Sequence, residues 1–206
     1  MSHNTWIHKI ARATIVRPLA KTAVTPNQVT TVRIIAGIAA AGALAVGDAS
    51  WSIVGGWLFM LSMLLDRADG DLARLTGRTS PGGHTYDLFA DAFCNALIFV
   101  GLGIGLRESD YGLWAIPMGA LAGIAVATIL MLVIRIERLQ GARAAEIGGL
   151  FGFDPDDGML AVPIAILLGW SSPLLLAASI GAPAFAVLFI FLFRKALRDE
   201  RASSST

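Results

Sequence analysis

The chain has 206 residues, of which 55% are hydrophobic and 15% are charged, and its formal net charge at pH 7 is +1. Ordinary soluble domains are less apolar and carry about 25% charged residues. This composition therefore excludes a typical soluble enzyme and indicates an integral membrane protein.

A short amphipathic helix is predicted at the N-terminus, over residues 3–18. Its apolar residues fall on one helical face, away from the charged ones: Trp6, Ile7, Ile10 and Ala13. Such a pattern is typical of a helix that lies in the membrane interface. Pro18 and the sequence Thr25-Pro26-Asn27 would end this helix and turn the chain into the membrane.

Six apolar segments follow, and each can contribute a membrane-spanning helix, which needs roughly 20 residues. The predicted spans are about residues 29–47, 51–75, 83–106, 111–137, 157–170 and 173–194. Because these spans leave only short connections, we expect one all-α membrane domain over residues 1–206. Any chemistry must then lie inside the helical bundle or at its rim.

The basic residues are distributed unevenly among the connections. Of the 16 Lys and Arg residues, all but Arg107 lie on one side of the alternating six-span path. Cytoplasmic loops contain an excess of Lys and Arg, so we expect both termini on the cytoplasmic side of the cell's inner membrane. Membrane orientation and headgroup contact explain this basicity, and no nucleic-acid partner is expected.

Four aspartates lie where the second span ends and the third begins. They are Asp66, Asp69, Asp87 and Asp91. In helical geometry Asp66 and Asp69 share a face, and Asp87 and Asp91 are one turn apart on the next span. A tight turn containing Pro81-Gly82-Gly83 joins these helices, which we expect to be antiparallel neighbours. The four carboxylates would then converge at the cytoplasmic edge of the bundle.

Clustered carboxylates are costly in a membrane bundle unless cations compensate their charge. Two divalent ions would balance four carboxylates, and oxygen ligands favour Mg²⁺ or Mn²⁺ over Zn²⁺. Gly70 and Ala73, on the face of Asp66 and Asp69, leave space for a ligand beside the helix backbone. Two metal ions beside such a space are suited to holding phosphate oxygens during a displacement reaction.

Intramembrane carboxylates also occur in ion transporters, which would carry a divalent metal ion or protons. Transporters usually place these groups near the membrane midplane in broken helices, often in repeated halves. Here the acids lie at one rim and within one half of the chain. A divalent-ion transporter is therefore the less favoured alternative.

One pattern covers the whole acidic segment: Asp66-x2-Asp69-Gly70-x2-Ala73-Arg74-x8-Gly83-x3-Asp87-x3-Asp91. It resembles the complete signature of the CDP-alcohol phosphotransferases, integral membrane enzymes of phospholipid headgroup synthesis. Every specified position is present with its spacing. The motif covers about an eighth of the chain, and the span count, the cytoplasmic placement and the interfacial helix extend the resemblance over nearly all of it.

The resemblance implies a role for each residue of the motif. The metal ligands would be Asp66, Asp69 and Asp87, and Asp91 would be the general base and share in the coordination of two Mg²⁺ or Mn²⁺ ions. The residues implied at the cytidine nucleotide site are Gly70, Ala73, Arg74, Gly83 and Asn27. Asn27 could equally serve only to cap the first span.

The implied reaction is attack of an alcohol oxygen on the β-phosphorus of a CDP-alcohol, which releases CMP and leaves a new phosphodiester. The metal ions would neutralise the pyrophosphate, and Asp91 would accept the hydroxyl proton. We expect CDP-diacylglycerol as donor and a small alcohol as acceptor. The alternative is a CDP-amino alcohol donor with diacylglycerol as acceptor. A homodimer in the membrane is a further implication of the family.

The polar loop between the fourth and fifth predicted spans has separated charges. Three arginines precede three acids: Arg135, Arg138 and Arg143, then Asp154, Asp156 and Asp157. The arginines could receive an anionic acceptor such as a polyol phosphate, or serve only in headgroup contact. The acids could bind an amino alcohol or a neutral polyol, or cap the next helix. Because these basic and acidic residues favour different acceptors, the sequence leaves the identity of the acceptor open.

Four other residues have simpler interpretations. Arg33, near the start of the first span, is expected to extend its side chain to the membrane interface. Asp71 points away from the other acids and towards Arg74, which predicts a surface ion pair. Asn95 is expected to form an interhelical hydrogen bond, and Cys94 to be a small packing residue.

Overall fold

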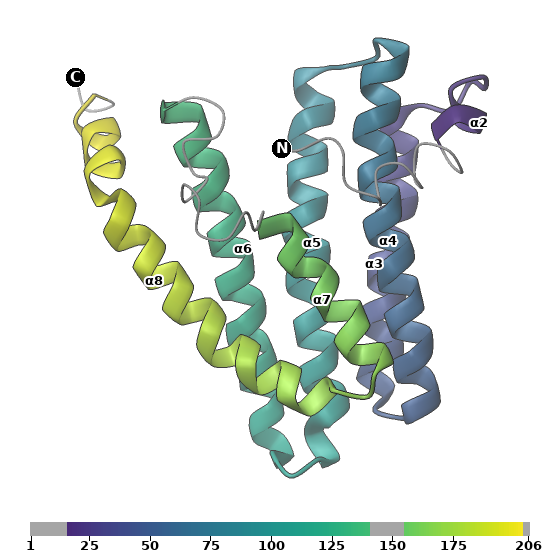
Figure 1. Ribbon diagram of the computed structural model, residues 1–206, viewed down its shortest axis with the longest axis vertical. Coiled ribbons are helices and arrows are strands. Elements are labelled where there is room, and N and C mark those ends of the chain that lie inside the picture. The colour runs from purple at the N-terminus through teal and green to yellow at the C-terminus, as the bar shows by residue number, and fades with distance from the viewer. Residues whose placement is uncertain (1–15, 141–154, 204–206) are drawn as a thin grey trace.

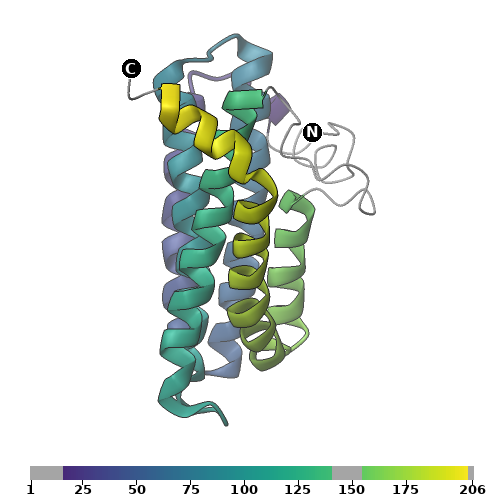
Figure 2. The same ribbon diagram turned by 90° about the vertical axis from the view of Figure 1, so that its left-hand side faces the viewer.

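The computed structural model describes residues 16–140 and 155–203, which form helices and turns and contain no strand. The long helices are α3 (Pro26–Val46), α4 (Ala49–Thr76), α5 (Pro81–Gly105), α6 (Ala115–Gln140) and α8 (Ser171–Ser203). The shorter ones are α2 (Arg17–Leu19), η2 (Leu106–Glu108), η3 (Gly112–Trp114) and α7 (Pro155–Leu167). From α3 to α6 the long helices alternate in direction along one bundle, and α8 runs in the same direction as α6, because α7 runs the opposite way between them (Figure 1). The view turned by 90° shows these helices lying along the length of the bundle (Figure 2).

Within the described residues, five segments are long and apolar enough to cross a membrane. They are Pro26–Val46, Ala49–Thr76, Pro81–Glu108, Gly112–Ile136 and Ser171–Arg194. Large apolar side chains such as Trp57, Ile124 and Val187 are exposed on the outer surfaces of these helices. Exposed apolar surface of this extent is unusual in a soluble monomer and fits contact with lipid. The chain is therefore a multi-pass membrane protein.

Helix α7 corresponds to the predicted span over residues 157–170. It is 13 residues long and contains Pro163, so it is shorter than the roughly 20 residues that cross the hydrocarbon core. It packs mainly against α4. The six-span count is thus not confirmed, and the interfacial helix predicted over residues 3–18 lies almost entirely outside the described residues.

Local capping explains where the helices near the acidic segment begin and end. Thr25 and Gln28 form a reciprocal capping box at the start of α3, and the Ser80 hydroxyl accepts a hydrogen bond from the Gly83 N–H at the start of α5. Gly77, with φ of 66°, ends α4 in the left-handed conformation that glycine adopts most readily. The chain therefore reverses direction within a few residues.

Helix α3 lies between α4 and α5 and packs along both. Helices α4 and α5 are antiparallel, as predicted, but they contact each other at few places. Glycine allows α3 and α5 to approach closely: a Cβ atom on Gly101 would lie 2.4 Å from the carbonyl oxygen of Ala41. Side chains of α3 can consequently reach both acid-bearing helices.

Candidate metal centre and active site

The position of Asp69 on α4 explains its burial. Leu65, Ala68 and Leu72 are buried against Val29 of α3, with the spacing of an apolar helix face. Asp69 falls on the same face and is 3% exposed. The packing that buries the apolar residues therefore buries this carboxylate as well.

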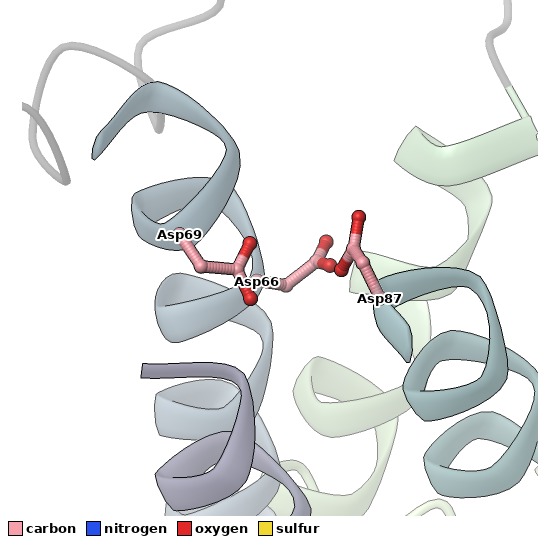
Figure 3. A group of neighbouring side chains, drawn as sticks. All are labelled: Asp66, Asp69 and Asp87. Atoms are coloured by element: carbon pink, nitrogen blue, oxygen red, sulfur yellow. The ribbon is translucent and has the colours of Figure 1, made fainter. Parts of the chain in front are cut away.

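Three of the predicted metal ligands come together. Asp66 and Asp69 from α4 and Asp87 from α5 each offer an oxygen atom, and these atoms all lie within 4.8 Å of one another. Figure 3 shows the carboxylates of Asp66 and Asp87 pointing towards each other from their two helices, with Asp69 beside Asp66. The predicted convergence of these three acids is thus present in the fold.

The fourth aspartate, Asp91, is joined to Asp66 and Asp87 through Arg33. The Nη1 atom of Arg33 lies 2.7 Å from Oδ1 of Asp66 and 3.2 Å from Oδ1 of Asp87, and its Nη2 atom contacts Asp91. Arg33 is only 3% exposed, so its predicted extension to the membrane interface is wrong. The side chain instead faces the acids, because α3 lies between α4 and α5.

The carboxylate of Asp69 has one paired and one unpaired oxygen. The Thr30 hydroxyl donates a hydrogen bond of 2.6 Å to Oδ2 of Asp69. The Oδ1 atom is buried and has no hydrogen-bond partner among the described residues. A buried oxygen of this kind calls for a donor or a cation, and neighbouring carboxylates form the all-oxygen ligand set that suits Mg²⁺ or Mn²⁺. Asp66, Asp69 and Asp87 therefore fit a divalent ion and could hold it.

A cleft of about 180 Å³ opens beside Asp69 and Asp87. Its walls include all the residues predicted at the nucleotide site: Asn27, Gly70, Ala73, Arg74 and Gly83. A Cβ atom on Gly83 would lie 3.0 Å from Oδ1 of Asn27 and 2.9 Å from Oγ of Ser80. This narrow part of the cleft wall therefore depends on the absence of a side chain at Gly83.

A second, smaller hollow of about 20 Å³ lies beside Asp66 and Asp91. Its other lining residues include Arg33, Ser62, Asn95 and Met159. The volume is about that of one water molecule. Asp69 and Asp87 line the cleft, whereas Asp66 and Asp91 line the hollow, so the carboxylates border two distinct spaces.

The structure also describes three other residues that the sequence analysis singled out. The ion pair between Asp71 and Arg74 is confirmed, with 2.8 Å between Oδ1 and Nη2. Cys94 is buried, in agreement with a packing role. Arg135 lies exposed near the end of α6.

The other residues of the proposed acceptor region lie outside the part of the chain whose side chains are described. These are Arg138, Arg143, Asp154, Asp156 and Asp157. The assignment of an acceptor site to this region stays a prediction.

Comparisons with known proteins assign this site to a family. A family model described as CDP-alcohol phosphatidyltransferase matches residues 23–193. A protein named "Bifunctional IPC transferase and DIPP synthase" from Rubrobacter xylanophilus is 36% identical over 87 residues, which make up 42% of this chain and 19% of that protein. The chain thus matches about a fifth of the length of this relative.

The match to the family model includes the four aspartates, Arg33 and the cleft. Members of the family depend on divalent metal ions, use CDP-alcohol donors and alcohol acceptors, and act in membranes. Membership of this family favours a transferase over the divalent-ion transporter. The chain belongs to the CDP-alcohol phosphatidyltransferase family, whose members are transferases of substituted phosphate groups.

Proposed function

We propose that the protein transfers a phosphatidyl group from CDP-diacylglycerol to the hydroxyl group of a small alcohol and releases CMP, as a step of phospholipid synthesis. One observation supports this proposal above all others. The residues predicted to bind the nucleotide line a single cleft, and Asp69 and Asp87 line the same cleft. A nucleotide in this cleft would place its pyrophosphate beside the carboxylates.

The residues of the cleft have distinct parts in binding. Gly70 leaves the backbone of α4 open to the ligand, since the nearest atom to a Cβ there would be Nη2 of the flexible Arg74 side chain, at 3.5 Å. Arg74 and Arg78 add positive charge to the cleft wall, where phosphate oxygens can accept charge-assisted hydrogen bonds. When bound to the four aspartates, two Mg²⁺ or Mn²⁺ ions would neutralise the pyrophosphate and stabilise the departing CMP.

Asp91 is the proposed general base. Its carboxylate lines the small hollow, where an acceptor hydroxyl can approach from a different side than the nucleotide. Asp91 accepts the hydroxyl proton as the new oxygen–phosphorus bond forms and the bond to CMP breaks. The recessed position of the acids within the bundle disfavours water as a competing nucleophile.

The acceptor and the arrangement in the membrane complete the proposal. Arg135, Arg138 and Arg143 would receive an anionic acceptor. The chain would form one domain over residues 1–206 with six spans, an N-terminal helix in the interface and a cytoplasmic active site in the inner membrane. It would assemble as a homodimer. The distribution of the basic residues supports this orientation.

The test is an acceptor screen with the purified full chain, labelled CDP-diacylglycerol and Mg²⁺ or Mn²⁺. We expect acceptor-dependent release of CMP and a lipid product that mass spectrometry identifies. Asp91→Asn should lower CMP release by about 10²- to 10⁴-fold, the usual contribution of a general base. The matched control is Asp48→Asn, because Asp48 caps the opposite end of α4 and Asn caps helices equally well.

Two outcomes would contradict parts of the proposal. Unchanged CMP release by Asp91→Asn would remove Asp91 as the base. Product from CDP-choline or CDP-ethanolamine with diacylglycerol, and none from CDP-diacylglycerol, would replace the proposed donor by the alternative one.

A further inference from the structure

Arg33 lies between carboxylates that the metal ions would bind. We infer that Arg33 acts as a resident cation of the metal centre, so that the chain holds one divalent ion without nucleotide and a second ion only together with the nucleotide's pyrophosphate. This inference rests on the proposed function, since it concerns the same site.

The burial and contacts of Arg33 show that it is part of the acidic cluster. It lies about two turns, or ~10 Å, inside α3, and its side chain is 3% exposed. A guanidinium in such surroundings is costly unless carboxylates pair with it. Its two terminal nitrogens contact Asp66, Asp87 and Asp91.

These contacts divide the carboxylates into two groups. Within the described part of the chain, Arg33 forms ion pairs with Asp66, Asp87 and Asp91 but none with Asp69. The buried Oδ1 atom of Asp69 also has no hydrogen-bond partner among the described residues. A first divalent ion can therefore bind the unpaired Oδ1 atom of Asp69, with oxygen atoms of Asp66 and Asp87 close by. The carboxylate of Asp91 is already paired with the guanidinium.

A second ion meets a different electrostatic environment. The guanidinium cancels one of the four negative charges of the aspartates, and it would repel a divalent ion placed within about 4 Å. A bound nucleotide adds the negative charges and the oxygen ligands of its pyrophosphate, which offset this repulsion. Mg²⁺ commonly binds in this way, through one or two carboxylates and substrate phosphates.

The coupling must act in both directions. If the nucleotide increases the affinity for the second ion, that ion increases the affinity for the nucleotide by the same factor. Arg33 would thus make the complete centre depend on the presence of the donor.

The experiment is a Mn²⁺ titration of the detergent-solubilised full chain, with free Mn²⁺ followed by electron paramagnetic resonance. The wild-type chain should bind one Mn²⁺ ion alone and two in the presence of CDP, which supplies the pyrophosphate. Arg33→Gln should bind two without CDP, with the Kd for the second ion lowered about tenfold or more by the loss of the charge. Arg33→Lys keeps the charge and should resemble the wild-type chain.

The matched control is Arg194→Gln. Arg194 is an exposed residue of α8 whose guanidinium lies over the ring of Phe191, and its replacement removes the same charge away from the acids. The number of Mn²⁺ ions bound should not change.

Several results would overturn the inference. Two Mn²⁺ ions bound by the wild-type chain without CDP would do so, as would weaker Mn²⁺ binding by an Arg33→Gln variant that circular dichroism shows to be folded. The second result would mean that Arg33 only holds the carboxylates together. If Arg33→Gln does not fold, the wild-type and Arg33→Lys titrations still decide, because both must bind a single ion without CDP.

The outcome is separable from that of the proposed function. A chain with the expected Mn²⁺ stoichiometries that releases no CMP from any CDP-alcohol would contradict the proposed function and leave the inference intact. A chain that releases CMP but binds two ions without nucleotide would contradict the inference and leave the proposed function intact.

Discussion

Single residues around the aspartates determine how the carboxylates are oriented. Thr30 holds one oxygen of Asp69 by a hydrogen bond of 2.6 Å, while the other oxygen has no such partner among the described residues. Hydrogen bonds to metal-binding carboxylates fix their orientation, and removing them commonly lowers metal affinity by about 10- to 100-fold. Thr30 therefore contributes to the site although it is not a proposed ligand.

Replacement of Thr30 tests this contribution. Thr30→Ala should weaken Mn²⁺ binding by about 10- to 100-fold, measured by titration without nucleotide, because it frees the carboxylate of Asp69 to rotate. Thr30→Ser keeps the hydroxyl group and should bind Mn²⁺ almost as well as the wild-type chain. Equal affinities in the two variants would show that the hydrogen bond has no part in metal binding.

Gly83 has a steric function at the cleft wall. A Cβ atom at this position would lie 3.0 Å or less from polar atoms of Asn27 and Ser80. Gly83→Ala should displace these side chains, at a cost of about 1–3 kcal/mol, and raise the KM for the CDP-alcohol about 5- to 100-fold. Gly82→Ala is the matched control, because a Cβ atom on Gly82 has no other atom within 4 Å among the described residues. A similar KM for both variants would contradict this function.

At the scale of helices, the site depends on the insertion of α3 between α4 and α5. Helix α4 supplies Asp66 and Asp69, α5 supplies Asp87 and Asp91, and α3 supplies the residues that contact both pairs. Small residues make this arrangement possible, since helix backbones can approach closely where side chains are absent. The distance between α3 and α5 therefore controls the geometry of the centre.

Gly101 offers a test of the packing between α3 and α5. Because a Cβ atom there would lie 2.4 Å from the carbonyl oxygen of Ala41, Gly101→Ala should separate the helices and destabilise the fold by about 1–3 kcal/mol. Thermal unfolding in detergent should show a lower Tm, and CMP release should fall with it.

The control for this variant lies on α3. Gly42 is exposed, and a Cβ atom there has no other atom within 4 Å among the described residues. Gly42→Ala should leave the Tm unchanged or raise it slightly, since alanine favours helix. An unchanged Tm in Gly101→Ala would show that the close approach is not needed.

At the scale of the whole molecule, the four aspartates of the site lie near one end of the bundle, as do the described basic residues Arg67, Arg74, Arg78 and Arg135. The turn between α4 and α5 and the start of α3 lie at this end, whereas the connection between α5 and α6 lies at the opposite end (Figure 1). Arg107, the one basic residue predicted on the far side, belongs to that connection. The positive-inside rule then predicts a cytoplasmic active site.

Cysteine labelling tests this orientation. Thr79 and Asp110 are exposed at opposite ends of the bundle, whereas the native Cys94 is 1% exposed. In intact cells a membrane-impermeant maleimide should label Asp110→Cys, and it should label Thr79→Cys only after permeabilisation. The native chain, which contains one cysteine, should stay unlabelled. The opposite labelling pattern would place the active site outside the cytoplasm.

Much of the site could be predicted from spacing along the chain. Helical periodicity places Asp66 and Asp69 on one face and Asp87 and Asp91 on another, and a short turn brings these faces near each other. The long spans could be predicted equally well, because the length of a continuous apolar segment reflects the thickness of the membrane. These features are local, and each depends on residues within a few turns of one another.

The role of Arg33 and the placement of α3 could not be predicted in this way. An arginine near the start of a span has the same sequence context whether its side chain reaches the interface or faces the bundle interior. The difference depends on which helices pack beside it, and here the close approach at Gly101 places α3 beside α5. The amino-acid pattern thus specified which groups the chain brings to the membrane edge. The packing of distant segments decided that a guanidinium lies among the carboxylates, because only three-dimensional contact determines which charges share a buried space.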